Sequence, residues 1–228
     1  YFTDEKIFET LALCEQNGIN TAILRLDSNT LRILNKYWKE RGGKIQWIAQ
    51  IAIDPRDLSD IKLAIDAGAV GVYTHGGVAE SLLKSKNLDI LGKALDIGRQ
   101  NKVIAGIAGH LIDVPIACEA AGLKPDFYMK TFNSKQYWSA QLPTEKDNVW
   151  DREPEKTEAF MANVTCPWIA YKILGAGAIQ PAEGFPWAFQ RGADFACVGM
   201  FDFQVSKDAE ICRKAVEFAQ KRPRPWCA

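Results

Sequence analysis

The stretch VIAGIAGHLIDVPIACEAAGLKPDFYMKT, residues 103–131, contains one complete unit of the predicted fold. Residues 103–109 and 126–131 are apolar runs of strand length,. Residues 114–121 lie between them with the spacing of an amphipathic helix, and Gly122 follows, where the helix should end,. Apolar strands that alternate with helices indicate a parallel sheet with its outer side covered by helices.

The same unit recurs along the chain. Strand-like runs fall at residues 19–26, 45–53, 70–75, 103–109, 126–131, 168–174 and 195–201. Helical patterns separate them, for example at residues 58–67, 78–84, 88–100, 114–121 and 154–163. Glycines suited to a left-handed helix end precede many strands, at Gly18, Gly43, Gly68, Gly122 and Gly192,.

This repetition predicts a (β/α)8 TIM barrel formed by one domain over residues 1–228,. Residues 1–17 have a helical pattern, so the seven runs are counted as strands two to eight, and the first strand is expected upstream of Tyr1. A doubly wound open sheet is the alternative, because seven strands need not close.

Composition excludes some classes of partner. Lys+Arg and Asp+Glu each number 28, which does not favour a general nucleic-acid surface,. No stretch approaches the roughly 18 apolar residues of a membrane span. The six cysteines are scattered without a CxxC pair, which favours buried thiols over disulfides,. The compartment stays open, either cytoplasmic or exported after removal of an N-terminal signal, and so does the oligomeric state.

Ionisable side chains gather where the predicted strands end. They are Asp27, Asp54, His75, His110, Lys130, Lys172 and Asp202. In barrel enzymes the site lies at the carboxyl ends of the strands, so these residues are expected at one mouth. The polar segment 133–153, with Trp138 and Trp150, is far longer than a usual connection and is predicted to form a lid,. Trp138 is expected to stack on a ligand or to pin this lid to the barrel.

Lys130 and Lys172 end neighbouring strands and are the main indication of chemistry. Burial and mutual repulsion lower a lysine pKa, and a neutral amine is the nucleophile of carbonyl chemistry. This prediction fails if the two ammonium groups lie far apart, or if each pairs with a carboxylate such as Asp126 or Asp202, because both lysines then stay charged. The alternative is that each lysine lies on the rim, with its stem on apolar surface and its head in water.

Other strand-end residues allow two further roles. His75 and His110 are general acid–base candidates, or metal ligands together with Asp54 and Asp27,. Asp54 and Asp27 are equally suited to a turn and to a helix cap. The glycines at positions 175, 177 and 199 are expected to bind phosphate or another compact anion through backbone amides, or simply to form tight turns,.

Lysines on predicted strands six and seven, followed by a glycine-bearing loop, resemble the class I aldolases, particularly deoxyribose-phosphate aldolase. The resemblance implies that Lys130 forms a Schiff base and that Lys172 tunes it. Residues 125–131, 137–139 and 192–203 also resemble an uncharacterised group of bacterial barrel proteins, some of them exported. That similarity covers most of the chain and implies the barrel fold.

Three functions are therefore considered. The first is a lyase of the Schiff-base aldolase type, without a cofactor, that acts on a small carbonyl compound, possibly phosphorylated. The second is an isomerase or hydrolase that depends on a divalent metal ion held by the strand-end histidines and aspartates. The third is a barrel that binds a small ligand without turning it over.

Overall fold

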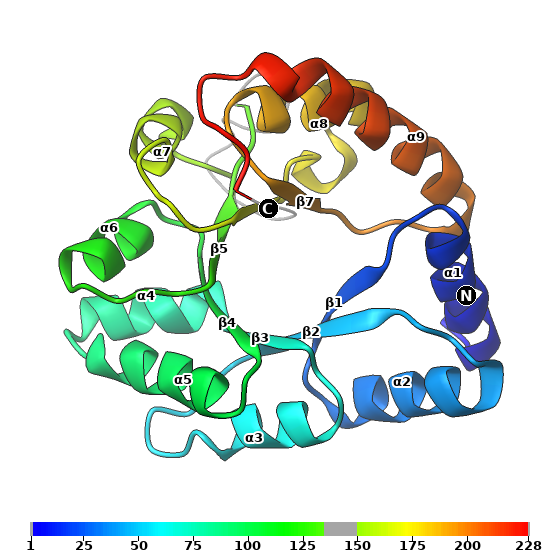
Figure 1. Ribbon diagram of the computed structural model, residues 1–228, viewed down its shortest axis with the longest axis horizontal. Helices are drawn as coiled ribbons and strands as arrows, with labels where there is room; N and C mark the ends of the chain where they lie inside the picture. The colour runs from blue at the N-terminus through cyan, green and yellow to red at the C-terminus, as the bar shows by residue number, and fades with distance from the viewer. Residues whose placement is uncertain (1, 135–149, 228) are drawn as a thin grey trace.

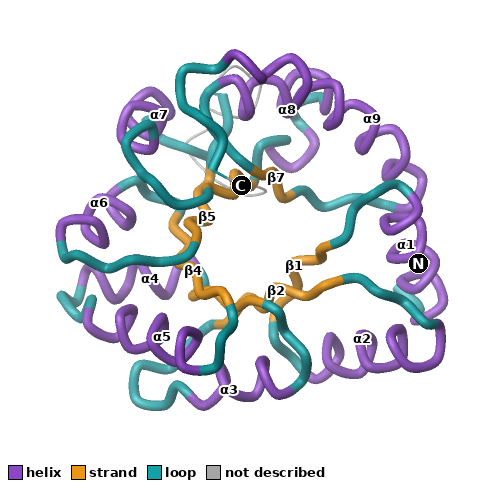
Figure 2. Tube along the Cα trace, in the orientation of Figure 1, coloured by secondary structure: helices purple, strands orange, loops and turns teal. Residues whose placement is uncertain are grey.

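The computed structural model describes residues 2–134 and 150–227, which form one seven-stranded parallel sheet in the order β1-β2-β3-β4-β5-β6-β7. The sheet curves into a nearly closed barrel, and the helices surround it on the outside (Figures 1 and 2). The strands are β1 (Thr21–Arg25), β2 (Gln46–Ile51), β3 (Gly71–Thr74), β4 (Ile104–Gly109), β5 (Phe127–Thr131), β6 (Trp168–Tyr171) and β7 (Phe195–Cys197).

The helices follow the predicted alternation. They are α1 (Asp4–Gln16), α2 (Ser28–Arg41), α3 (Ser59–Asp66), α4 (Gly76–Lys84), α5 (Asp89–Gln100), α6 (Asp113–Ala120), α7 (Pro154–Met161), α8 (Pro181–Gln190) and α9 (Asp202–Phe218), with short 3-10 turns η1 (Gly175–Gly177) and η2 (Ala219–Lys221). In the part of the chain that is described, none of them is both long and apolar enough to cross a membrane.

The predicted TIM barrel is confirmed, and its sheet is open on one side. Each strand pairs with its neighbour in sequence, whereas a doubly wound sheet would reverse its order at a switch point,. Within the described residues β1 and β7 do not pair with each other, so the sheet is open where the missing strand was predicted. Helices α1 and α9 pack together on this side (Figure 1).

Helix ends follow the local signals with one correction. Thr3 caps α1 through its hydroxyl, which accepts a hydrogen bond from the Lys6 amide at 3.3 Å. Helix α2 ends at Gly42, with a φ of 65°, rather than at Gly43 as predicted. Gly43 is constrained instead by packing, because a Cβ there would lie 2.0 Å from the Tyr37 ring.

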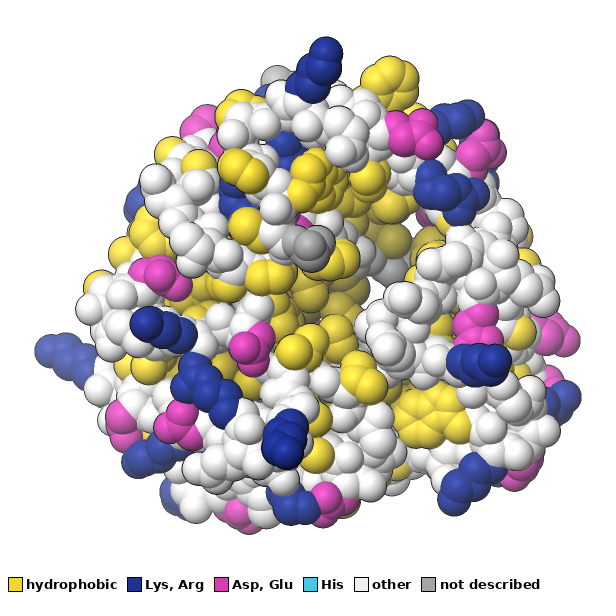
Figure 3. All heavy atoms as spheres, in the orientation of Figure 1, with side chains coloured by type: hydrophobic (Ala, Val, Ile, Leu, Met, Phe, Trp, Pro, Cys, Tyr) yellow, Lys and Arg dark blue, Asp and Glu magenta, His cyan; other side chains and the backbone are white. Residues whose placement is uncertain are grey.

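Two apolar cores share the sheet. The larger one fills the layer between strands and helices, and the smaller one lies inside the barrel around Tyr73, Phe127 and Met129. On β5, Phe127 and Met129 therefore face inward, and Tyr128 between them packs in the outer layer,. Apolar side chains also surround the hollow at the centre of the face seen in Figure 3.

Candidate active site

A cavity of about 240 Å³ lies beside the carboxyl ends of β3, β4 and β6. It is lined by Gln50, Tyr73, His75, Gly76, Ala108, His110, Tyr171 and Lys172. This space is large enough for a small organic molecule. Three of the predicted site residues, His75, His110 and Lys172, meet here.

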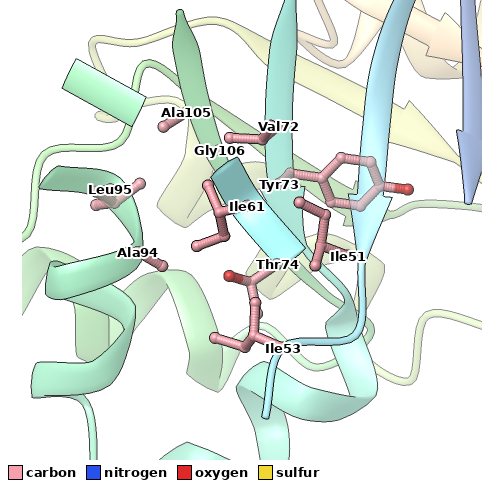
Figure 4. Close-up of a pocket in the computed structure, with 10 residues that line it drawn as sticks. All are labelled: Ile51, Ile53, Ile61, Val72, Tyr73, Thr74, Ala94, Leu95, Ala105 and Gly106. Atoms are coloured by element: carbon pink, nitrogen blue, oxygen red, sulfur yellow. The ribbon is translucent and has the colours of Figure 1, made fainter. Parts of the chain in front are cut away.

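A second cavity lies between the sheet and helices α3 and α5 (Figure 4). Its volume is about 10 Å³, and side chains such as Ile61, Val72 and Leu95 line it. A space of this size holds at most one water molecule, and Tyr73, the one ionisable residue that lines it, has its ring in the inner cluster of the barrel,. The cavity with the two histidines is therefore the candidate active site.

His75 and His110 directly follow β3 and β4, which places both rings at the mouth of the barrel. The ring centroids are 6.3 Å apart, with the planes edge to face at 73°. Burial lowers the pKa of His75, and the neighbouring His110 ring lowers it further. His75 is thus held neutral, the form that accepts a proton.

Glu80 orients His110. Its Oε1 accepts hydrogen bonds from the backbone amides of His110 at 2.6 Å and Leu111 at 3.1 Å, and it lies 3.1 Å from His110 Nδ1. Burial by itself raises the pKa of Glu80, but the hydrogen bond and charge of His110 outweigh it and hold the pKa below its usual value. A carboxylate at this position accepts a hydrogen bond from the Nδ1–H of the neutral ring, which leaves Nε2 as the nitrogen that can accept a proton.

Gly76 and Tyr171 complete this wall of the cavity. A Cβ at Gly76 would lie 3.2 Å from both His110 Nδ1 and the Tyr171 hydroxyl, so a larger residue would crowd the site. The Tyr171 and His110 rings are 5.7 Å apart. Burial raises the pKa of Tyr171, which keeps its hydroxyl protonated and able to donate a hydrogen bond.

Sequence reasoning missed Glu80 and Tyr171, although both had local signals. Glu80 follows Gly76 by four residues, so the two share one face of α4,. Tyr171 directly precedes Lys172 and ends β6 with its side chain in the inner cluster.

Lys172 reaches the cavity through an unusual backbone conformation. It follows the last residue of β6, where strand alternation would place it on the same outer side as Ala170,. Its φ is 61°, in the left-handed region, and Lys172 is one of the residues that line the cavity. The Lys172 carbonyl accepts hydrogen bonds from Asn133 Nδ2 and from the Gly175 amide, each at 3.0 Å.

Lys130 is not part of the cavity lining. It is fully buried on β5, and its Nζ donates to the Thr131 carbonyl at 2.6 Å and to Asp151 Oδ2 at 3.2 Å. Burial lowers the pKa of Lys130, whereas the Asp151 carboxylate opposes this lowering. The structure thus does not bring Lys130 and Lys172 to one cavity, and Lys130 lies outside the space in which a substrate would bind.

The three strand-end aspartates serve surface contacts. Asp27 caps α2 through the Thr30 amide at 2.8 Å, Asp54 pairs with Arg56 at 3.1 Å, and Asp202 pairs with Lys6 at 2.6 Å. The structure does not gather Asp27 and Asp54 with the two histidines: among the described residues, no three or more His, Cys, Asp or Glu side chains are placed to hold a metal ion.

The glycine loop has the predicted tight turn. Gly175 and Gly177 have φ values of 50° and 92°, and the amides of Gly175, Gly177 and Ala178 already donate to carbonyls of the same loop. An anion would have to compete with these bonds. A Cβ at Gly199 would meet no atom within 4 Å, and anion binding stays a prediction. Trp138 and most of the predicted lid lie outside the described residues.

Comparison with known proteins supports the barrel fold of this chain. No family model and no curated protein matches the chain. A Pseudomonas aeruginosa protein provisionally described as an aldo-keto reductase aligns with a TM-score of 0.66 and 15% identity over 94% of this chain and 84% of its own.

Two further solved structures show the same likeness. A 4-hydroxy-2-oxoglutarate/2-dehydro-3-deoxyphosphogluconate aldolase aligns with a TM-score of 0.57 and 12% identity over 92% of this chain and 88% of its own. The N-acetylmannosamine-6-phosphate 2-epimerase of Clostridium perfringens aligns with a TM-score of 0.57 and 14% identity over 95% and 86%. At such identities the likeness shows the fold alone.

Proposed function

We propose that the chain is a lyase of the class I aldolase type, in which Lys172 rather than Lys130 forms the Schiff base with a small carbonyl compound. The observation that carries this proposal is the cavity itself, where Lys172 lies with His110 and Tyr171. An amine nucleophile and a base held by a carboxylate are the groups that Schiff-base chemistry needs.

In the proposed reaction, Lys172 Nζ adds to the carbonyl carbon, and the carbonyl oxygen leaves as water after protonation. His110 Nε2 then takes the proton of the substrate's β-hydroxyl while the adjacent carbon–carbon bond breaks and its electron pair passes to the iminium. The resulting enamine is protonated, and water releases the lysine. Tyr171 donates a hydrogen bond to the hydroxyl that leaves or enters. If the substrate is phosphorylated, its phosphate would bind at the loop around Gly175 and Gly177, as predicted from the sequence.

The first prediction tests the amine. Sodium borohydride with glycolaldehyde or dihydroxyacetone should reduce an adduct on Lys172, and mass spectrometry of the digested protein should locate it. Lys172→Met should abolish the adduct. Lys86→Met is the matched control, because Lys86 has the same φ of 61° but is exposed at the end of α4. An adduct on Lys130, or none on Lys172, would refute this assignment.

A proton-transfer isomerase or epimerase is the second candidate, and the pair His75 and His110 favours it. Two imidazoles whose centroids are 6.3 Å apart can remove and return a proton at one carbon,. In that case Lys172 acts as an ammonium beside the carbonyl oxygen, and borohydride traps nothing. Deuterium uptake from D2O into a substrate, lost in His110→Asn, would then identify the reaction, and chelator treatment would test the metal-dependent alternative.

A further inference from the structure

We propose that Lys130 is a positioning residue: its buried ion pair with Asp151 holds Asn133, and Asn133 holds the backbone of Lys172 in the conformation that directs the amine into the cavity. What Lys172 does there rests on the proposed function. The positioning itself rests only on contacts among described residues.

The first step is the buried pair. The side chains of Lys130 and Asp151 are 1% and 2% exposed, with Nζ and Oδ2 3.2 Å apart. Asp151 Oδ1 accepts a hydrogen bond from the Glu153 amide at 3.1 Å, so both carboxylate oxygens are engaged. Since β5 fixes Lys130 in the sheet, the pair fixes residue 151 against the outer side of the barrel.

The second step links Asp151 to the cavity. The Asp151 amide donates to Asn133 Oδ1 at 3.1 Å, and Asn133 Nδ2 donates to the Lys172 carbonyl at 3.0 Å. Asn133 is fully buried, and it follows β5 by two residues. Its side-chain amide therefore joins the backbone after β5 to the backbone after β6.

The third step is the conformation of Lys172. A left-handed backbone costs a residue with a Cβ on the order of 1 kcal/mol, so it needs support from its surroundings. Asn133 and Gly175 supply that support through the Lys172 carbonyl. Without it Lys172 would relax to an ordinary conformation, and its side chain would leave the cavity wall.

An ion pair is a poor way to gain stability at such a position. Replacing a buried pair by apolar residues of similar volume is often neutral or stabilising, whereas the ion pair enforces one geometry. The Lys130–Asp151 pair gives residue 151 a single position, which the hydrogen bonds pass on to Lys172. Replacing both residues of the pair by apolar ones should therefore change the position of Lys172 without unfolding the protein.

The experiment reads the position of Lys172 directly. Reductive methylation with 13C-formaldehyde labels the lysine amines, and Lys172→Met identifies the Lys172 resonance. In the wild type, the rings of Tyr171, His75 and His110 should shift this resonance away from that of exposed Lys86. In the double variant Lys130→Met/Asp151→Leu the two resonances should coincide, while the melting temperature stays near that of the wild type.

A second variant keeps the test decisive if the double variant does not fold. Asn133→Asp keeps an acceptor for the Asp151 amide but removes the donor to the Lys172 carbonyl, and it should also lose the shift difference. A Lys172 resonance that stays in its wild-type place in folded Asn133→Asp would overturn the proposal. A different pair of results is that the wild type forms no borohydride-reducible adduct while Asn133→Asp still loses the shift difference. That pair of results would reject the Schiff-base mechanism but support the positioning of Lys172 by Asn133.

Discussion

Two buried ionic clusters lie at opposite ends of the barrel and are built differently. Asp194, just before β7, binds Arg222 and Arg224 of the C-terminal tail at 2.5 Å and 2.6 Å. Lys130, near the carboxyl end of β5, pairs with one carboxylate among the described residues, that of Asp151. All five side chains are at most 3% exposed.

The Asp194 cluster is saturated by main-chain partners. Asp194 also accepts from the backbone amides of Trp168 and Cys227, each at 2.9 Å. Arg224 donates to backbone carbonyls, those of Met161, Gly192, Val164 and Cys166. This cluster fastens residues 222–227 to the amino ends of β6 and β7. None of the partners named here lines the cavity.

Among the residues that the structure describes, the Lys130–Asp151 pair has fewer hydrogen-bond partners than the Asp194 cluster, and its hydrogen bonds lead to the cavity through Asn133. The difference teaches that burial and charge alone do not identify a site. Asp194 holds the fold together, whereas Lys130 supports one residue of the site. The remaining predictions test this division, from the largest expected effect to the smallest.

Asp194→Ala should lower the free energy of unfolding most, by about 4 kcal/mol, because it leaves two buried guanidinium groups without their counter-ion. Urea unfolding followed by tryptophan fluorescence measures this loss. Asp66→Asn is the matched control, since Asp66 pairs with Lys62 on the exposed face of α3 and should contribute at most about 0.5 kcal/mol,. If Asp194→Ala lowered the free energy of unfolding by less than about 1 kcal/mol, Asp194 would not be a main stabilising residue of the fold.

Lys130→Met should destabilise the fold by about 3 kcal/mol, because Asp151 then stays buried without a cation. Adding Asp151→Leu should restore most of this loss, since the uncompensated charge is gone. Urea unfolding of the two variants gives both values. If the double variant is as unstable as the single one, the pair contributes to folding beyond its charge, and positioning is no longer separable from folding.

The smallest effect concerns pH. Burial lowers the pKa of His75 below its unfolded value of about 6.5, so between those two pKa values the unfolded chain binds more protons and stability falls as pH falls,. His75→Gln should therefore lose less free energy of unfolding than the wild type between pH 7.5 and 5. Glu80 acts at lower pH, because its lowered pKa gives stability that is lost only as pH falls through the folded pKa. Equal losses in both proteins would contradict the burial of His75.

Much of the fold was predictable because its signals are local. Apolar runs of strand length, helical spacing and glycines such as Gly68 and Gly122, with φ values of 102° and 70°, are read from short windows of sequence. The order of the strands follows from their parallel pairing with sequence neighbours,. Gly42 rather than Gly43 ends α2; two adjacent glycines are equally suited to a helix end, and the contact with Tyr37 that requires a glycine at position 43 is formed only in the fold.

The site was predictable in part. His75, His110 and Lys172 meet at one cavity because each directly follows a parallel strand, and such positions share one end of a barrel,. Glu80 and Asp151 were not predicted, since a helix and a connection bring them in from outside the strand ends. Among the described residues Asp27 and Asp54 do not lie with the two histidines, because Asp27 caps a helix and Asp54 forms a turn, and both of these local roles were open from the sequence.

The sequence by itself determined the seven strand–helix units and the position of His75, His110 and Lys172 directly after strands. The tertiary structure alone decided which side of the barrel wall each lysine faces. Strand alternation sends Lys130 outward into a dry layer, where it needs Asp151, and a left-handed backbone turns Lys172 to the cavity. Lys130 and Lys172 thus differ in environment although their local sequences are similar. The direction of each side chain and the backbone conformation of each residue depend on contacts between segments that are distant in the sequence.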